Sequence, residues 1–407
     1  MKLTVITGYY FPEQTADVHL NYDLVSGLSE KFDLTLITQF PIRNVPKSRQ
    51  LEYVSRCDER VSNTLRILRI GKPATFKKSI AQRGAFLVMQ SLKMFRTAKK
   101  TETDVFLITS TPPFLGYVAA MLAKRKPVIY LVRDMFPDSL VHTKKLDENN
   151  FVIKILRIFE KKVYAKSSHL IAISDDIKKT LVSKGICENK ISVIYDWIDE
   201  KLCCPVEKED NPLFDEFGLD RGKFYVCYAG NIGPLQNVDI IVDVAKQLED
   251  ECPNLRFLII GDGSCDSELD FYIRNKNATT VLRFPMQPLE RVPYVYSLGD
   301  ACLVTLKHDI TKYALPSKTW SVMATGRAVI CSFDRYSALA TIIEDNNCGI
   351  CTEPEDIGAL AEAIRKLYYE AGTAKEMGIS GRRYIENNLT KESALSKYVE
   401  LLKHWQK

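Results

Sequence analysis

Short runs of apolar, β-branched residues alternate with amphipathic stretches along the first half of the chain. The runs have the length of buried strands, and the amphipathic stretches repeat their apolar positions with the period of a helix. The first strand is expected at "LTVITG" (3–8), a helix at 20–32 and the second strand at "DLTLITQF" (33–40). Further strands are expected at 104–110, 127–134, 169–174 and 190–199. This rhythm is typical of a parallel, doubly wound sheet.

The rhythm stops at residues 200–222, which are charged and irregular, and then restarts. Strands are expected at 223–233, 255–263, 279–284, 301–306, 328–333 and 349–353, with amphipathic helices between them. The domain organisation predicted is therefore a first domain at 1–199, a linker at 200–222, a second domain at 223–388 and a last helix at 389–407.

The fold class predicted is α/β, with two Rossmann-like, doubly wound, parallel-sheet domains. Ligands of such folds bind outside the carboxyl ends of the strands. With two domains, these edges can face each other across a cleft. The alternative is that the second domain only enlarges the protein.

The composition supports two domains and excludes some classes of function. A chain of 407 residues is too long for one core. Its net charge of +5 is small for this length, so nucleic-acid binding is not expected. Most of the 11 cysteines lie in apolar runs, which favours reduced thiols in a cytoplasmic protein over disulfides or a zinc site. No signal peptide or transmembrane segment is expected.

Two strands of the second half end in glycine-rich turns. "YAGNIG" contains Gly230, Asn231 and Gly233, and "IIGDG" contains Gly261. Glycines at these places let the backbone approach a ligand, and amide groups at a following helix can bind an anion. Tight turns after strands also need glycine, so each turn alone is weak evidence. Two turns on neighbouring strands favour a binding site.

The segment "YALPSKTWSVMATGRAVI" (313–330) predicts a helix that begins near Pro316 and is followed by a strand. Free amides near Ser317 and Lys318, with the Lys318 cation, would suit a diphosphate. A departing diphosphate needs dipoles and cations to stabilise its charge. The alternative is a surface helix with ordinary lysines.

Three acidic residues are candidates for the chemistry. Glu13 lies in the loop after the first strand, and Asp134 follows the strand at 127–132. Both are proposed to orient an acceptor or to support charge, although each can also be simply solvated. Glu344 follows a later strand and is a candidate for contacting a ribose hydroxyl.

Several motifs in a common order carry a family resemblance. They are "GYYFPEQTADVHLNYDLVSGLSEKFDLTLIT", "TSTPPFLGYVAAMLA", "RDMFPDSL", "FEKKVYAKSSHLIAIS", "YAGNIG", "IIGDG" and "PSKTWSVMATGRAVI". The chain resembles the family-4 glycosyltransferases, which have the GT-B fold. Within them it is similar to the bacterial surface-polysaccharide branch, which includes fucosamine transferases of O-antigen and capsule synthesis.

The resemblance implies a retaining transfer from a nucleotide sugar, with a UDP-sugar as the expected donor, to an acceptor hydroxyl. The nucleotide would bind the second domain, and a saccharide or lipid-linked acceptor would bind the first. It also implies that no metal ion or other cofactor is needed, and that the last helix packs on the first domain.

The chain departs from the family pattern at four positions. Many members have two glutamates separated by seven residues, where this chain has Tyr313 and Ser321. The arginine and lysine common after the "YAG" strand are Asn231 and Gln236 here. We therefore expect Lys318 and neighbouring amides to bind the diphosphate instead.

A basic and apolar segment at 76–100 raises the question of membrane contact. A helix of this kind can lie on the anionic inner membrane surface. A core-facing helix with a solvated basic side is an equal alternative.

Two other functions fit the same fold. A sugar-nucleotide epimerase would act without an acceptor, and a non-catalytic partner subunit would bind a nucleotide sugar without turnover. A dinucleotide-dependent dehydrogenase is disfavoured because "GYYFPE", not GxGxxG, follows the first strand.

Overall fold

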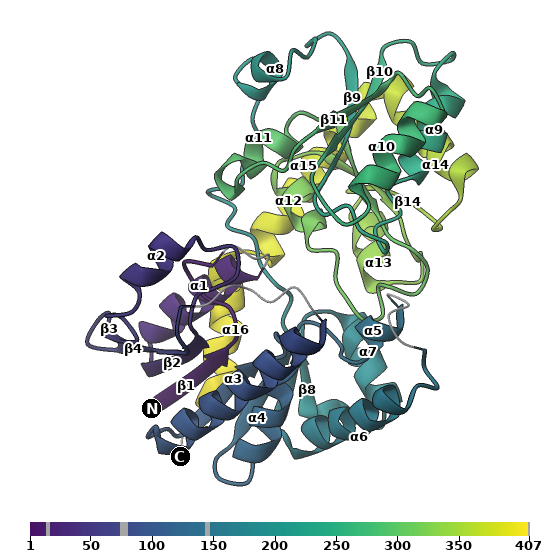
Figure 1. Ribbon diagram of the computed structural model, residues 1–407. Coiled ribbons are helices and arrows are strands. Elements are labelled where there is room, and N and C mark those ends of the chain that lie inside the picture. Colours follow the sequence, from purple (N-terminus) through teal and green to yellow (C-terminus); the bar gives the residue numbers. More distant parts are fainter. Residues whose placement is uncertain (14–16, 74–79, 143–146, 406–407) are drawn as a thin grey trace. The chain divides into compact units, whose positions relative to one another are not determined.

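The computed structural model describes residues 1–13, 17–73, 80–142 and 147–405, and the chain divides into two compact units (Figure 1). The first unit contains Met1–Asp196 together with Glu392–Lys407. The second unit contains Trp197–Lys391.

The first unit is built on an eight-stranded sheet with the order β3-β4-β2-β1-β5-β6-β7-β8. Every neighbouring pair is parallel except β3 and β4. The strands are β1 (Lys2–Thr7), β2 (Asp33–Gln39), β3 (Asp58–Arg60), β4 (Leu65–Ile70), β5 (Val105–Thr109), β6 (Val128–Val132), β7 (His169–Ala172) and β8 (Ile191–Val193).

The helices of the first unit cover its sheet. They are α1 (Val18–Ser29), α2 (Lys47–Glu52), α3 (Ile80–Lys100), α4 (Leu115–Leu122), α5 (Asp138–His142), α6 (Phe151–Lys166), α7 (Asp175–Ser183), the 3-10 helix η1 (Glu188–Lys190) and α16 (Lys391–Lys403). The central strands β5 and β6 are buried along their whole length because helices cover the sheet.

The second unit has a six-stranded, fully parallel sheet with the order β11-β10-β9-β12-β13-β14. Its strands are β9 (Phe224–Ala229), β10 (Leu255–Ile260), β11 (Val281–Phe284), β12 (Ala301–Thr305), β13 (Ala328–Ser332) and β14 (Gly349–Thr352). Its helices are α8 (Leu213–Glu216), α9 (Ile240–Leu248), α10 (Asp266–Asn275), η2 (Leu289–Arg291), α11 (Val292–Tyr296), α12 (Lys318–Ala324), α13 (Ala338–Asp345), α14 (Ile357–Tyr369) and α15 (Ala371–Asn388).

The predicted fold class, two Rossmann-like α/β domains with parallel sheets, is confirmed. The sequence analysis missed β3 and β4 at the outer edge of the first sheet. Strand β4 reads "LRILRI" and buries only every second residue fully. A search for continuous apolar runs overlooks such a strand, since two arginines interrupt its apolar residues.

Residues 200–222, expected to be a linker, are folded into the second unit. The Lys208 ammonium lies 2.8 Å from an Asp300 carboxylate oxygen and donates to the Lys223 carbonyl. The Asn211 amide donates to the Tyr294 carbonyl at 2.8 Å. These contacts bind the charged segment to the sheet that follows it in the sequence.

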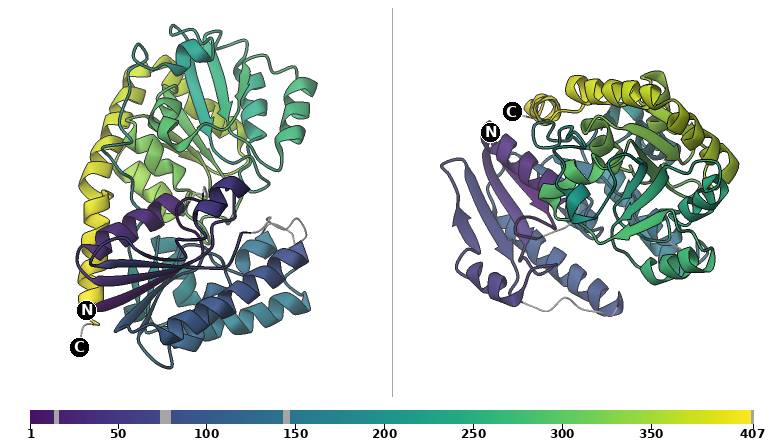
Figure 2. Two further views of the ribbon diagram at one scale, coloured as in Figure 1. Left: turned by 60° about the vertical axis from the view of Figure 1, so that its left-hand side comes forward. Right: turned by 90° about the horizontal axis from the view of Figure 1, so that it is seen from above.

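The C-terminal helix α16 is part of the first unit, where it runs beside α1 (Figure 2). The contact is close, because a Cβ added to Gly27 of α1 would lie 2.4 Å from a methyl group of Leu395. Tyr398 and Leu402 of the same helix are completely buried. A glycine in α1 therefore makes room for the returning chain end.

All eleven cysteines are free thiols. Cys348 and Cys351 have the spacing of a CxxC motif, and Cys351 stands in register opposite Cys331 on the neighbouring strand. These three side chains are buried, which keeps them from reagents in solution.

Candidate functional site

Two candidate residues of the second unit meet at the carboxyl edge of its sheet. Strand β9 ends at Ala229, and Gly230 follows with a φ of 134°, which L-residues rarely adopt. A Cβ atom on Gly230 would lie 2.9 Å from Nζ of Lys318. The glycine therefore provides both the turn and the room that the lysine needs.

The ammonium of Lys318 has no counter-ion among the described residues. The residue is partly exposed, but its Nζ contacts no solvent and has no hydrogen-bond partner among the described residues. It lies over the Tyr228 ring, 3.9 Å from the ring centre. Desolvation lowers the pKa of Lys318 to about 7. An anion bound next to Nζ would stabilise the ammonium and raise the pKa of Lys318 again.

Neutral side chains line the turn that follows Gly230. The Asn231 amide donates to the Gln236 side-chain oxygen at 3.1 Å, so the residues in place of the expected arginine and lysine bond to each other. A Cβ on Gly233 would lie within 3 Å of both side chains. The Tyr228 hydroxyl donates to the Asn231 carbonyl at 2.8 Å. This turn therefore supplies polar groups but no charge.

Gly261 joins this group through the backbone. Its φ is 155°, and a Cβ there would lie 1.9 Å from the carbonyl oxygen of Gly230. The amide of Gly230 donates to the Ile260 carbonyl at 2.9 Å. Gly261 thus lets the ends of β9 and β10 approach each other. The structure brings together Gly230, Asn231, Gly233, Gly261 and Lys318.

The beginning of α12 differs from the expectation of free amides. The Ser317 amide donates to the Leu315 carbonyl at 2.8 Å, and the Thr319 amide donates to the Pro316 carbonyl at 3.0 Å. Helix α12 is only 7 residues long, and the Ser317 side chain makes no capping hydrogen bond. The charge available here is therefore that of the Lys318 side chain.

Glu344 lies in the last turn of α13, away from the carboxyl end of β13. Its carboxylate pairs with Arg335 at 2.8 Å. A ribose contact, as expected for Glu344, would therefore compete with this ion pair.

Among the described residues, one group has side chains that suit a metal ion: His308, Asp334 and Glu353, which follow three adjacent strands. Their ligand atoms lie within 4.8 Å of one another. Asp334 is buried, and its two carboxylate oxygens accept from the Asp309 amide and the Thr311 hydroxyl, both at 3.0 Å. The Asp334 carboxylate therefore already stabilises the loop after β12 through these two hydrogen bonds.

In the first unit, Asp134 stands at the carboxyl end of β6. The Ser110 hydroxyl accepts from the amides of Arg133 and Asp134 at 3.0 and 3.2 Å, which fixes the backbone here. The Asp134 side chain is exposed at the surface, yet many protein atoms surround its carboxyl group. This desolvation, aided by the charge of Asp17, raises the pKa of Asp134 to about 6.

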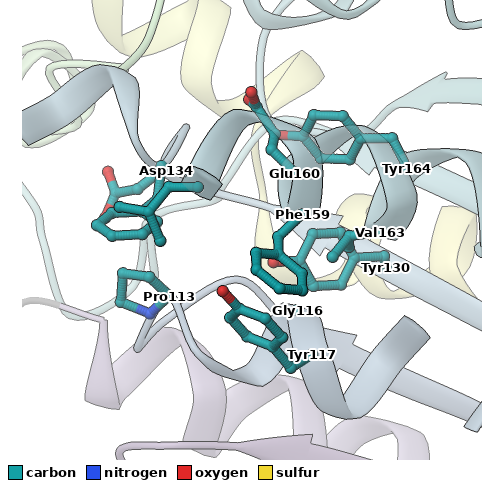
Figure 3. Close-up of a pocket in the computed structure, with 11 residues that line it drawn as sticks. Pro113, Gly116, Tyr117, Tyr130, Asp134, Phe159, Glu160, Val163 and Tyr164 are labelled. Carbon is teal, nitrogen blue, oxygen red and sulfur yellow. The ribbon is translucent and has the colours of Figure 1, made fainter. Parts of the chain in front are cut away.

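A small pocket lies next to Asp134 (Figure 3). Asp134 borders one side, and the rings of Tyr117 and Phe159 lie on another, with their centroids 4.7 Å apart. The volume is about 30 Å³, which suits a water molecule but not a sugar ring. The aromatic wall gives the neighbourhood of Asp134 an apolar character.

A buried polar cluster beside Asp134 was not predicted. Arg133 donates from Nη1 to the Asn21 side-chain oxygen at 2.6 Å, and its Nε lies 3.3 Å from Oδ1 of Asp196. Burial lowers the pKa of the neighbouring His19, while the charge of Asp196 opposes this shift. Sequence alone offered one signal, a charged residue directly after a buried strand.

Glu13 is buried in the loop after β1 and holds the loop after β2. Its Oε1 accepts from the amides of Ile42 and Arg43 at 3.1 and 3.0 Å. Its Oε2 has no hydrogen-bond partner in the described part of the chain. Burial raises the pKa of Glu13 to about 7, although the two amide bonds oppose the shift. The contacts of Glu13 differ from those of Asp134, because Glu13 follows β1 and Asp134 follows β6.

Known proteins resemble this chain over nearly its full length. Residues 20–202 match the family described as Glycosyltransferase Family 4, and residues 210–384 match the glycosyl transferases group 1. WbjE of Pseudomonas aeruginosa, described as a probable glycosyltransferase, is 25% identical over 366 residues, which cover 89% of this chain and 85% of WbjE.

Two further proteins are similar. CapM of Staphylococcus aureus, a capsular polysaccharide biosynthesis glycosyltransferase, is 20% identical over 298 residues, covering 70% of this chain and 73% of CapM. The structure of HepE from Anabaena in complex with UDP-glucose superposes with a TM-score of 0.71 at 16% identity, covering 99% of this chain and 100% of HepE. This likeness shows a shared GT-B fold. The chain belongs to the glycosyltransferases, with a family 4 domain over residues 20–202 and a group 1 domain over residues 210–384.

Proposed function

We propose that this glycosyltransferase moves a sugar from a UDP-sugar to a hydroxyl of a saccharide or lipid-linked saccharide, with retention at the anomeric carbon. The process proposed is the synthesis of a bacterial surface polysaccharide such as O-antigen or capsule. The role of CapM in capsular polysaccharide synthesis and the UDP-glucose bound to HepE support this proposal.

The single observation that carries the proposal is the position of Lys318. Within the described part of the chain its ammonium has no counter-ion; it touches the Tyr228 ring and adjoins Gly230, where the backbone has no side chain to exclude a ligand. A diphosphate that binds here would neutralise Lys318. The same ammonium would then stabilise the charge that develops on the diphosphate as it leaves.

We propose that this lysine replaces a metal ion. The Asn231 amide and the Ser317 hydroxyl lie on the two segments that flank Lys318 and supply neutral donors to the phosphates. Gly233 and Gly261 act indirectly, since they let the two turns come close enough for the backbone to reach the donor.

In the transfer step, the bond between the anomeric carbon and the diphosphate oxygen breaks, and UDP leaves with the electron pair. The acceptor oxygen forms the new bond on the same face of the sugar, and its proton passes to the departing diphosphate. Asp134 is proposed to orient this hydroxyl, since a pKa of about 6 leaves its carboxylate ionised at neutral pH. The free Oε2 of Glu13 is proposed to support positive charge during the step.

The experiment is a transfer assay with purified protein, a panel of UDP-sugars and lipid-linked saccharide acceptors. The expected result is a glycosylated acceptor whose anomeric configuration, measured by NMR, matches that of the donor. An inverted product would contradict retention. Isomerisation of the UDP-sugar without acceptor would identify an epimerase, and binding without turnover would identify a non-catalytic subunit.

A further inference from the structure

Three helices of the first unit form a continuous layer on one side of its sheet. Helix α4 lies between α3 and α6 and contacts both (Figures 1 and 2). We call the outward side of this layer the α3–α6 face. Residues 74–79, which precede α3 and include part of the basic segment noted in the sequence, lie outside the described residues.

The outward side of α3 carries apolar side chains near its middle and basic side chains toward its end. Near the middle of the helix, Met89 is 47% and Leu92 is 45% exposed. Its second half exposes Lys93, Arg96, Lys99 and Lys100. These positions recur every three or four residues and so share one side of the helix. The sequence of α3 contains no aspartate or glutamate.

Helix α6 also exposes both apolar and basic side chains. Its first half exposes Phe151 and Ile158, which are 75% and 56% exposed. Its outward basic side chains are Lys154, Lys161, Lys162 and Lys166. The single acidic residue of α6, Glu160, is buried and pairs with Lys184 at 2.5 Å. It therefore contributes no free charge to the surface.

Further exposed basic residues follow α4, which lies between α3 and α6. Lys124, Arg125 and Lys126 follow α4 and are exposed. Two acidic residues at the margins are already paired, Glu148 with Arg157 at 3.0 Å and Glu102 with Lys2 at 2.7 Å. The combination of basic and exposed apolar side chains suits the headgroup region of an anionic bilayer.

The start of α6 lies toward the candidate acceptor residue. In a parallel α/β sheet the helices run antiparallel to the strands, so each helix begins near the carboxyl edge. Asp134 lies at this edge, just after β6. The exposed Phe151, the first residue of α6, therefore lies at the same edge as the residue proposed to orient the acceptor.

We propose that the α3–α6 face docks on a bilayer that contains anionic lipids. The exposed apolar side chains of α3 and α6 enter the headgroup region, and the basic side chains of both helices contact lipid phosphates. This inference rests on the proposed lipid-linked acceptor, whose lipid would keep the saccharide at the membrane surface. A second copy of the chain is a poorer occupant, since two basic faces repel each other. None of the helices in the described ranges is long and apolar enough to cross a membrane.

Sedimentation with vesicles tests the proposal without any donor or acceptor. The probes are vesicles of phosphatidylcholine alone and vesicles with added phosphatidylglycerol. The test variants are Arg96→Glu/Lys99→Glu for charge and Met89→Gln/Leu92→Gln for apolar contact. The matched control is Lys366→Glu/Lys375→Glu, which reverses two exposed lysines on α14 and α15 of the second unit.

We expect binding only to the anionic vesicles, weakening with added salt. The Arg96→Glu/Lys99→Glu variant should bind at least about tenfold more weakly, because each basic residue near an anionic surface contributes to the attraction. The Met89→Gln/Leu92→Gln variant should also bind more weakly, and the control should bind like the wild type. The positions are exposed, and circular dichroism checks that each variant is folded.

Equal binding by the wild type and both test variants would overturn the proposal, as would equal binding to both kinds of vesicle. Dimerisation that the same substitutions abolish would identify a second copy of the chain as the occupant of the face. This result would also overturn the proposal. Transfer to a water-soluble acceptor is measured in parallel. Lost vesicle binding with intact transfer removes only the docking proposal, whereas absent transfer with intact binding removes only the proposed reaction.

Discussion

The Nζ atom of Lys318 lies 3.9 Å from the centre of the Tyr228 ring, next to a glycine and without a hydrogen-bond partner in the described part of the chain. An aromatic face attracts a cation, but it does not replace the water that burial removes. The protein therefore keeps a destabilised positive charge at the place where the diphosphate is proposed to bind.

The first prediction concerns stability without ligand. Replacing Lys318→Met removes the buried charge and keeps the apolar stem, so the free energy of unfolding at pH 7 should rise by about 2 kcal/mol. The folded pKa of about 7 lies below the ordinary 10.5. Between these values the unfolded chain binds more protons than the folded chain. The destabilisation of the wild type by Lys318 therefore decreases as the pH rises.

Thermal unfolding from pH 7 to pH 10 measures this difference. The melting temperatures of wild type and Lys318→Met should converge toward pH 10. Lys307→Met is the control, since this nearby lysine is exposed and should change little. A difference that is constant over the whole range would contradict the buried charge.

The second prediction concerns Gly230. In Gly230→Ala, the new methyl group meets the Lys318 ammonium and the backbone keeps a φ of 134°. The strain should destabilise the protein by about 1–3 kcal/mol, and displacement of the lysine should weaken UDP binding. Gly372→Ala is the control, because an added Cβ there meets no atom within 4 Å. Calorimetric titration with UDP that gives equal affinities for wild type and Gly230→Ala would refute the placement.

The third prediction separates two roles of Glu13. In Glu13→Ala, the amides of Ile42 and Arg43 lose their acceptor, which should cost about 1–3 kcal/mol of stability. Glu13→Gln keeps an acceptor oxygen but carries no charge. In the wild type, the pKa of Glu13 is about 7, so above this pH the folded protein carries an unfavourable buried charge. The variant should therefore match the wild type below pH 4.5 and be more stable above pH 7, as measured by denaturant unfolding.

The transfer rate of Glu13→Gln then reports on the chemistry. If the free carboxylate oxygen supports charge in the reaction, this well-folded variant should lose activity. Wild-type activity would limit Glu13 to holding the loop.

The fourth prediction concerns the pH dependence of transfer. The carboxyl group of Asp134 has a pKa raised to about 6, so it becomes protonated as the pH falls below that value. Activity should therefore decline below pH 6 in the wild type. Asp134→Asn should lower kcat/KM by about two orders of magnitude and lose this acid limb. The exposed Asp33→Asn is the control. An unchanged acid limb in Asp134→Asn would assign the titration to another group.

The sequence predicted the sheets well because their central strands are buried on both faces and read as continuous apolar runs. It missed β4, whose short apolar run is interrupted by two arginines. It also could not place the boundary near residue 200, since the contacts that bind Lys208 and Asn211 to the second unit come from residues far along the chain.

The candidate site was predictable in part. The glycines after β9 and β10 and Lys318 stood out by type and position. That Lys318 of α12 lies over Tyr228 of β9 depends on packing between segments far apart in the sequence, and the bond from Asn231 to Gln236 depends on how the loop after β9 folds. The ion pair between Glu344 and Arg335 also could not be predicted from their spacing in the sequence. The cluster around Arg133 joins the ends of β6 and β8 to helix α1, which a linear pattern does not connect.

The most direct measurement is the affinity of UDP for wild type and Lys318→Ala, by calorimetric titration with a chelator present. We predict that the wild type binds UDP in the chelator and that Lys318→Ala binds at least about tenfold more weakly, since it loses a charge-assisted contact. Equal affinities would contradict the role of Lys318. Binding by the wild type only after a divalent metal is restored would contradict the metal-free site and direct attention to His308, Asp334 and Glu353.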